Sequence, residues 1–323
     1  MKKYLYIAIA AATLASCSQD EVMDVAEKEA IAFGGGYVEN STRAVDNVSK
    51  TNSTLESFIL HGTVTNKVGD SDVTVKLYDG EEVKGKVGNE TWTGYSKQYW
   101  IEGASYKFAA IVDGTVATTA NNMPATLSYE LSSQKDMLYD EEIRNNVGSS
   151  DYGTVQFTFS HLLSKIFFNF RLNAASGNES YTYKVTDVKI TSGLATKGTY
   201  TCAEDGTWSI TGSPTTGSLE FGAIDGASDN GTAVALTTSN QDSQYARLII
   251  PGQQTLAVQY TLHTYFGNTE IDRDTKTASV THTFVKNHVY GINASVAPLS
   301  NEINFTVSSF TDWTNGGTVD VQQ

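Results

Sequence analysis

The chain has 323 residues, of which 40% are hydrophobic, and it contains 27 glycines and 4 prolines. This length is typical of two domains rather than one small domain, and the apolar content is sufficient for hydrophobic cores. The formal net charge of -14 at pH 7 argues against nucleic acid as a partner, because phosphates require a basic protein face. The same charge argues against electrostatic binding to anionic lipids.

The N-terminal residues have the pattern of an export signal. Two lysines precede an apolar run over residues 4–15, which is too short to span a bilayer. The run ends in Leu-Ala-Ser-Cys at residues 14–17, which resembles the lipobox of bacterial lipoproteins, where the cysteine receives a diacylglycerol and becomes the mature N-terminus. We therefore expect residues 1–16 to be a signal peptide and Cys17 to carry acyl chains, palmitate among them, that anchor the protein in the outer membrane. An ordinary signal peptide with a chance cysteine and a short core helix are the alternatives.

Two further features precede the main body of the sequence. Residues 18–30 are acidic and poor in aromatics, which is typical of a tether, and the alternating Ile31-Ala32-Phe33 places Ile31 and Phe33 on one face of an extended segment. Residues 39–50 are polar and rich in turn formers, and they contain the bond between Arg43 and Ala44. Such a stretch is a preferred site for proteolysis.

From Leu55 onward the apolar residues recur with period two, between clusters of glycine, asparagine and aspartate, which predicts an all-β fold. Helical periodicity is present only briefly, over residues 160–165, and we place a domain boundary at residues 158–161. The expected strands cover residues 57–62, 73–78, 90–92, 98–101, 106–112, 155–159, 166–172, 183–190, 198–201, 207–210, 247–250, 257–266, 288–293, 303–307 and 318–321.

No catalytic or metal-binding constellation stands out among the titratable residues. The histidines, at 61, 161, 263, 282 and 288, do not form a His-Glu-x-x-His motif or pair with cysteine at metal-ligand spacing. Cys202 has no intrachain partner once Cys17 is lipidated, and it fits a half-buried strand residue. We therefore expect no enzymatic activity, no cofactor and no metal.

One aromatic cluster has two interpretations. Trp92, Tyr95, Tyr99 and Trp100 lie close in sequence, and exposed rings of this kind stack on sugar faces. Alternatively, alternate members pack inside a sandwich and leave the tyrosine hydroxyls at the rim. The second interpretation is favoured.

Several short motifs, in this order, resemble the fimbrillin-like proteins, which are subunits and accessory lipoproteins of the type V pili of Bacteroidia. The motifs are the lipobox, Ser-Thr-Arg-Ala at 41–44, Leu-Glu-Ser-Phe at 55–58, Tyr-Trp at 99–100 before Tyr-Lys-Phe-Ala-Ala at 106–110, Phe-Ser-His-Leu-Leu-Ser-Lys-Ile at 159–166, Gly-Thr-Tyr at 198–200, Gly-Thr-Trp at 206–208 and Trp313. No single motif is strong, and their order and spacing carry the resemblance.

The resemblance implies two tandem transthyretin-like β-sandwich domains, over residues 44–158 and 159–323, preceded by a lipidated tether or propeptide at residues 17–43. It also implies that a trypsin-like, arginine-specific protease cuts after Arg43 and removes the first strand of the N-terminal domain. A donor strand from a neighbouring subunit then fills the vacated groove, as expected for strand addition to an open sheet.

Several segments have the alternation that a donor strand requires. Ile31 and Phe33 meet the requirement in the uncut chain, and the candidates near the C-terminus are Ile303, Phe305, Val307, Val319 and Val321. The alternative is that both C-terminal segments are ordinary closing strands, and this alternative is favoured for residues 303–307.

The sequence thus predicts a structural, pilin-like surface lipoprotein that acts as a stalk, anchor or tip of an adhesive fimbria. Its expected partners are other pilin subunits, the outer membrane through the lipid, the protease, and an adhesion ligand that the sequence leaves open. A glycan-binding surface lipoprotein for nutrient uptake is the rival function.

Overall fold

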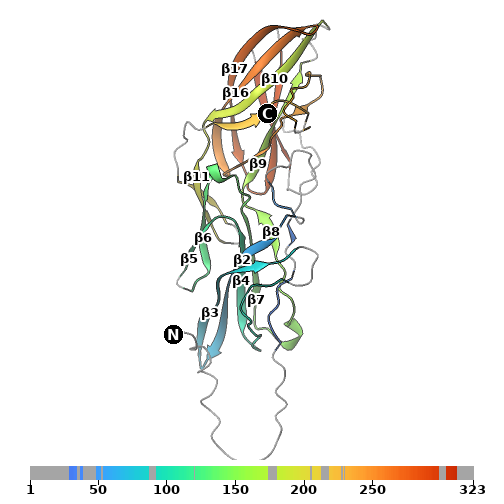
Figure 1. The fold of residues 1–323 in the computed structure, drawn as a ribbon. Coiled ribbons are helices and arrows are strands. Elements are labelled where there is room, and N and C mark those ends of the chain that lie inside the picture. Colours follow the sequence, from blue (N-terminus) through green and yellow to red (C-terminus); the bar gives the residue numbers. More distant parts are fainter. Residues whose placement is uncertain are drawn as a thin grey trace, which may run out of the picture.

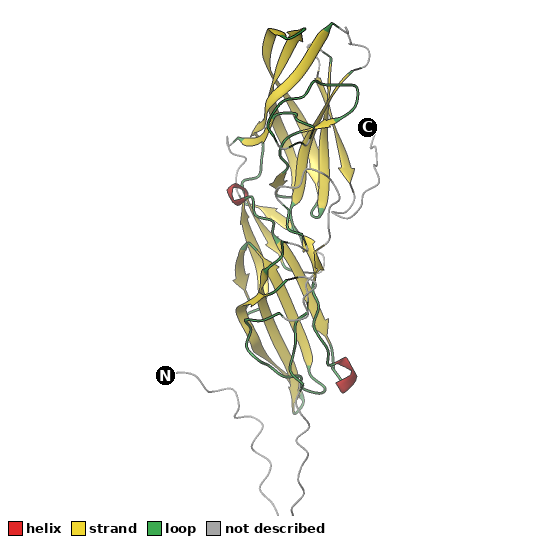
Figure 2. Cartoon of the chain, turned by 45° about the vertical axis from the view of Figure 1, so that its right-hand side comes forward, coloured by secondary structure: helices red, strands yellow, loops and turns green. Residues whose placement is uncertain are grey.

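The computed structural model describes residues 29–34, 37–38, 49–51, 54–86, 92–119, 121–173, 180–203, 206–211, 218–226, 228, 230–297 and 303–310. These residues form an elongated, nearly all-β molecule, with the strands of the first half at one end and those of the second half at the other (Figure 1). The helical elements are the short 3-10 turns η1 (Leu131–Ser133) and η2 (Ser149–Asp151), drawn in red in Figure 2. Within the described residues no helix is long and apolar enough to cross a membrane.

The first half of the chain builds a six-stranded sheet with the order β1-β8-β7-β4-β2-β3. Within it, β4 is buried over most of its length and β2 over residues 60–64, whereas β7 mixes polar and apolar residues. The strands are β1 (Tyr37–Val38), β2 (Ser57–Val68), β3 (Ser71–Lys84), β4 (Ser105–Val112), β7 (Leu138–Arg144) and β8 (Thr158–His161).

The second half contains two sheets that face each other across one core. The first has the order β13-β10-β16-β17, and the second has the order β14-β9-β18-β19 with β15 also paired to β9. The strands are β9 (Ser164–Leu172), β10 (Tyr181–Ser192), β13 (Leu219–Gly222), β14 (Gln241–Asp242), β15 (Arg247–Ile249), β16 (Gly252–Phe266), β17 (Thr269–Phe284), β18 (His288–Val296) and β19 (Ile303–Phe310).

A fourth sheet, with the order β12-β11-β6-β5, joins the two halves of the sequence. Its strands are β5 (Thr115–Thr118), β6 (Pro124–Glu130), β11 (Lys197–Thr201) and β12 (Trp208–Ile210). Because β11 pairs with β6, residues from the second half of the chain complete a sheet that begins in the first half. The domain boundary expected at residues 158–161 stays a prediction.

Three groups of buried side chains follow from this arrangement. One lies among the strands of the first half and is rich in aromatics, one lies between the two sheets of the second half, and the third fills the junction. The junction core contains Met137, Leu162 and Leu163, which lie beside the crossing from β8 to β9. It also contains Tyr200 of β11, so the fourth sheet is packed onto that crossing.

The all-β prediction is confirmed, whereas the expected helical turn at residues 160–165 is wrong. Those residues end β8, cross the junction and begin β9, and their apolar side chains at 162 and 163 are buried there without helical spacing. Sequence periodicity also missed β17, because this edge strand is exposed over most of its length and carries threonine and charged side chains. β6 and β7 were missed for a similar reason, since each mixes polar and apolar residues.

Candidate functional site

The segment at residues 29–34 is inserted between two other parts of the first half. At one end, the Ile31 N–H donates to the Gln98 carbonyl at 2.9 Å, and the Trp100 N–H donates to the Glu29 carbonyl at 3.0 Å. At the other end, Val155 donates to the Ala32 carbonyl, and Gly34 donates to the Val155 carbonyl, both at 2.8 Å. The segment therefore has backbone partners on both sides.

The N-terminal segment also pairs in parallel with the chain at and before β8. Phe33 lies in a parallel bridge with Val155, and β1 pairs in parallel with β8 so that Tyr37 is opposite Thr158. The chain approaches closely at Gly34, where an added Cβ would lie 2.6 Å from the Thr154 methyl carbon. Glycine at this position thus allows the two backbones to pair.

The alternation predicted for Ile31 and Phe33 places both side chains in the core of the first half. Ile31 is 2% exposed and Phe33 is 1% exposed. The Phe33 ring has edge-to-face contacts with Tyr95, Tyr78 and Phe108, at centroid distances of 5.0, 5.4 and 5.4 Å. It also stacks on Phe157 at 6.0 Å, so this ring from the N-terminal segment fills the centre of the aromatic core.

The first C-terminal donor candidate is a strand of the second half. Ile303, Phe305 and Val307 lie in β19, which pairs antiparallel with β18 over its whole length. The Phe305 ring lies 6.4 Å from the rings of both Phe168 and Phe170. Phe305 and Val307 are partly buried against the core of the second half, as the closing-strand alternative expects.

Other predicted site residues lie outside the described residues. These are the lipidation site Cys17, the cleavage-site pair Arg43 and Ala44, and the donor candidates Val319 and Val321.

The aromatic cluster near residue 95 packs mainly inward, as the favoured interpretation expects. Trp92 is 3% exposed and Trp100 is 4% exposed, and both belong to the core of the first half. Tyr95 is partly buried against the same core, whereas Tyr99 is exposed. The rings therefore do not form the exposed platform on which the glycan-binding rival depended.

The titratable residues are used in local contacts. Burial raises the pKa of the Cys202 thiol to about 12, with a smaller contribution from the Glu141 carboxylate, so the thiol is unreactive near neutral pH. His263 contacts Glu270 at 3.1 Å and Thr186 at 2.9 Å, and the rings of His282 and His288 lie 5.1 and 6.1 Å from the Tyr290 ring. Within the part of the chain that the structure describes, no group of three or more His, Cys, Asp or Glu residues is arranged to hold a metal ion.

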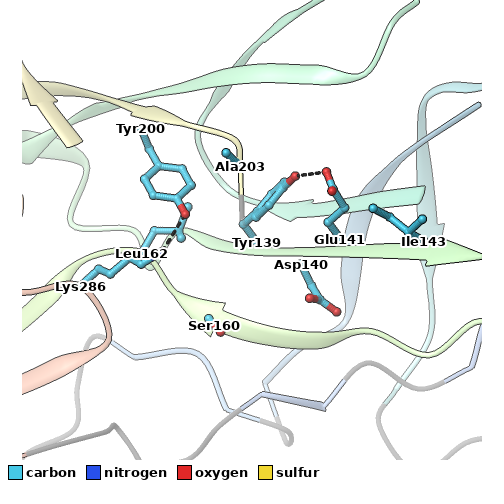
Figure 3. A pocket seen from close by; sticks show the side chains of 9 residues that line it. All are labelled: Tyr139, Asp140, Glu141, Ile143, Ser160, Leu162, Tyr200, Ala203 and Lys286. Carbon is cyan, nitrogen blue, oxygen red and sulfur yellow. Dashed lines mark hydrogen bonds between the residues drawn. The ribbon is translucent and has the colours of Figure 1, made fainter. Parts of the chain in front are cut away.

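A cavity of about 430 Å³ opens at the junction, where β7, β8 and β11 approach one another (Figure 3). Its polar groups bond to each other: the Tyr139 hydroxyl donates to Glu141 at 3.0 Å, and the Lys286 ammonium donates to the Tyr200 hydroxyl at 2.8 Å. Desolvation raises the pKa of Asp140 in this cavity to about 6. The Asp140 carboxylate accepts a hydrogen bond from the Thr158 backbone N–H at 2.6 Å.

Comparison with known proteins agrees with this architecture. The model of the fimbrillin-like family matches residues 42–313. A fimbrial protein from Bacteroides vulgatus is similar in structure, with a TM-score of 0.60 and 18% identity over 88% of this chain and 99% of that one. A search of curated protein sequences gave no match.

Two further solved structures are similar with lower scores. A putative cell adhesion protein from Bacteroides uniformis has a TM-score of 0.46 and 14% identity, over 88% of this chain and 100% of that one. A fimbrial assembly protein from Parabacteroides distasonis has a TM-score of 0.40 and 15% identity, over 85% and 95%.

The fold and the site define an elongated all-β protein whose N-terminal segment places Ile31 and Phe33 in its first core. Since the family model covers most of the sequence, the chain belongs to the fimbrillin-like family. Membership supports a pilin-like role in adhesion at the cell surface.

Proposed function

We propose that this protein is a lipoprotein precursor that enters a surface fimbria by strand complementation. A trypsin-like protease cuts after Arg43, the segment that includes residues 29–38 leaves, and a strand from a neighbouring copy takes its place. The observation that supports the proposal is the burial of Phe33 in the aromatic core by a segment that precedes the cleavage candidate.

The physical basis is the groove that loss of this segment would create. Departure of Ile31, Phe33 and Val38 would expose apolar pockets, and full burial of such side chains stabilises a fold by about 1.5–3 kcal/mol each. Backbone groups of Gln98, Trp100 and Val155 would lose their partners. An extended strand with alternating apolar side chains restores both, because the backbone bonds do not depend on sequence.

The chain has more than one segment with the alternation required of the donor. β19 already completes the second half, so its donation would open that sheet, whereas the segment with Val319 and Val321 follows β19 in sequence. We therefore propose the segment after β19 as the donor. Cys17 is proposed as the lipidated residue that holds the uncut precursor in the outer membrane.

The test is treatment of the purified precursor with an arginine-specific protease, followed by N-terminal sequencing and electron microscopy. We expect one stable product that begins at Ala44, and the appearance of rods that lengthen with time or of capped dimers. The variant Arg43→Ala should give neither, and Val319→Asp with Val321→Asp should be cut but remain monomeric. Digestion that continues through the fold, or a product that starts elsewhere, would overturn the processing step.

A separate measurement tests the anchor. Mass spectrometry of the protein extracted from membranes should find acyl chains on residue 17, and Cys17→Ala should release the protein into the soluble fraction. Membrane retention of that variant would contradict lipidation as the anchor.

A further inference from the structure

A buried polar cluster lies where the chain crosses from β8 to β9. Its members are Asp136, His161 and Lys165, all of which are at most 1% exposed. His161 Nδ1 lies 2.8 Å from Asp136 Oδ2. Two of the three residues belong to the Phe-Ser-His-Leu-Leu-Ser-Lys-Ile motif. Strand complementation does not assign a role to this motif.

The cluster contacts a short segment at the other end of the sequence. The Lys50 backbone N–H donates to Asp136 Oδ2 at 2.6 Å, and the Lys165 ammonium donates to the Ser49 hydroxyl at 3.1 Å. Immediately afterwards a turn forms, in which Thr54 and Leu55 both donate to the Thr51 carbonyl. This turn leads into β2, so residues 49–51 are tied to the body of the first half.

Hydrogen bonds to buried charged groups are costly to break. A carboxylate or an ammonium that loses a partner in the interior incurs a desolvation penalty that water does not relieve. Within the described residues, Asp136 Oδ1 has no hydrogen-bond partner, so the bonds to this carboxylate are made through Oδ2. Displacement of residues 49–51 would remove the Lys50 donor from that oxygen.

The two N-terminal segments are therefore held by different chemistry. Residues 29–34 and 37–38 are held by backbone pairing and by the apolar side chains of Ile31, Phe33 and Val38, both of which another strand can supply. Residues 49–51 are instead bonded to buried polar side chains, and one of these bonds uses the Ser49 hydroxyl, which a strand with alternating apolar side chains does not carry. The sequence between these segments contains Arg43.

We propose that Asp136, His161 and Lys165 form a clamp that retains residues 49–51 and thereby sets the boundary between the removable N-terminal segment and the permanent fold. Asp136 and Lys165 hold the segment, and His161 positions the Asp136 carboxylate. This inference rests on the proposed function for its biological meaning. It also predicts that a protease that accepts lysine cuts slowly after Lys50.

The test measures how readily residues 49–51 detach from the fold in the intact precursor. In the wild type, hydrogen exchange should show a protected Lys50 amide, and early tryptic digests should lack a fragment that begins at Thr51. In Lys165→Met and Asp136→Asn, we expect Lys50 exchange and the Thr51 fragment to accelerate about tenfold or more, as for loss of a hydrogen bond to a charged group. Lys135→Met is the matched control, because that lysine is exposed, and it should behave as the wild type.

A second variant covers the case in which a core replacement does not fold. Ser49→Ala changes only the segment itself and leaves the three buried side chains in place, and it should also speed Lys50 exchange. An unprotected Lys50 amide in the wild type, or equal rates in wild type, Ser49→Ala and Lys165→Met, would overturn the clamp. Neither readout requires a cut after Arg43, so failure of the clamp and failure of processing are distinguishable.

Discussion

The variant Phe33→Ala tests whether residues 29–38 form a separately opening part of the fold. Phe33 is almost fully buried and contacts four aromatic rings at 5.0–6.0 Å. Truncation of a buried phenylalanine costs about 3–5 kcal/mol, and aromatic pairs add specificity to that contact. If the free energy of opening of this segment alone decreases by about 3 kcal/mol, the population of its open state rises by roughly 150-fold.

Hydrogen exchange is the appropriate assay because the segment's amides report its opening. The amides of Ile31 and Gly34 donate from the segment to Gln98 and Val155, and the Val155 amide donates to Ala32 in the segment. Exchange of these three amides should accelerate by at least about 100-fold in Phe33→Ala. Amides in β16, at the other end of the molecule, should change little. Addition of a peptide with the sequence of the proposed donor segment should restore protection at Val155.

Two matched controls sharpen the result. Val75→Ala shortens an apolar side chain that is 49% exposed, and it should leave all rates unchanged. Phe305→Ala removes a ring from the core of the second half and should affect β18 but not Gly34. If Phe33→Ala instead lowers protection equally in β4 and β16, the segment unfolds only with the whole protein, and the reasoning for a removable strand fails.

Two other predictions concern the junction. Burial raises the pKa of the Cys202 thiol to about 12. Iodoacetamide at pH 8 should therefore label this thiol at least about 100-fold more slowly in the native protein than in guanidinium chloride. Peptide mass spectrometry measures the two labelling rates, and equal rates would contradict the burial of Cys202. Burial raises the pKa of Asp140 from 3.8 to about 6, so the folded state binds more protons than the unfolded state between these values, and stability from this group is lost as pH rises through that window. Asp140→Asn should therefore raise the melting temperature more at pH 7.5 than at pH 4, in thermal melts of both proteins. The same difference at both pH values would refute this assignment.

The fold class could be predicted because local alternation reports burial directly. Ile31 and Phe33 alternate with Ala32 and are buried, and in β4 the alternate side chains of Tyr106, Phe108 and Ala110 lie in the same core. The inward packing of Trp92 and Trp100 followed from the same spacing. Edge strands such as β17 give no such signal, since one face and one edge remain in solvent.

Part of the candidate site could be predicted, but its partners could not. The sequence indicated that Ile31 and Phe33 share a face, because that depends only on strand geometry. It did not indicate that Phe33 lies beside Val155, since a parallel pairing across more than a hundred residues has no local signal. Nor did it indicate the role of Lys165, because a lysine within an apolar run is ordinarily expected to reach solvent.

The sequence by itself determined the all-β class, the export signal pattern, the order of family motifs and the alternation that prepares a strand for burial. These properties depend on neighbouring residues alone. Only the tertiary structure decided that Ile31, Phe33 and Val38 enter the first core, that β11 joins β6, and that Asp136 and Lys165 bond to residues 49 and 50. Those outcomes depend on contacts between backbone groups and buried side chains that are far apart in the sequence. Such groups come together only when the chain folds.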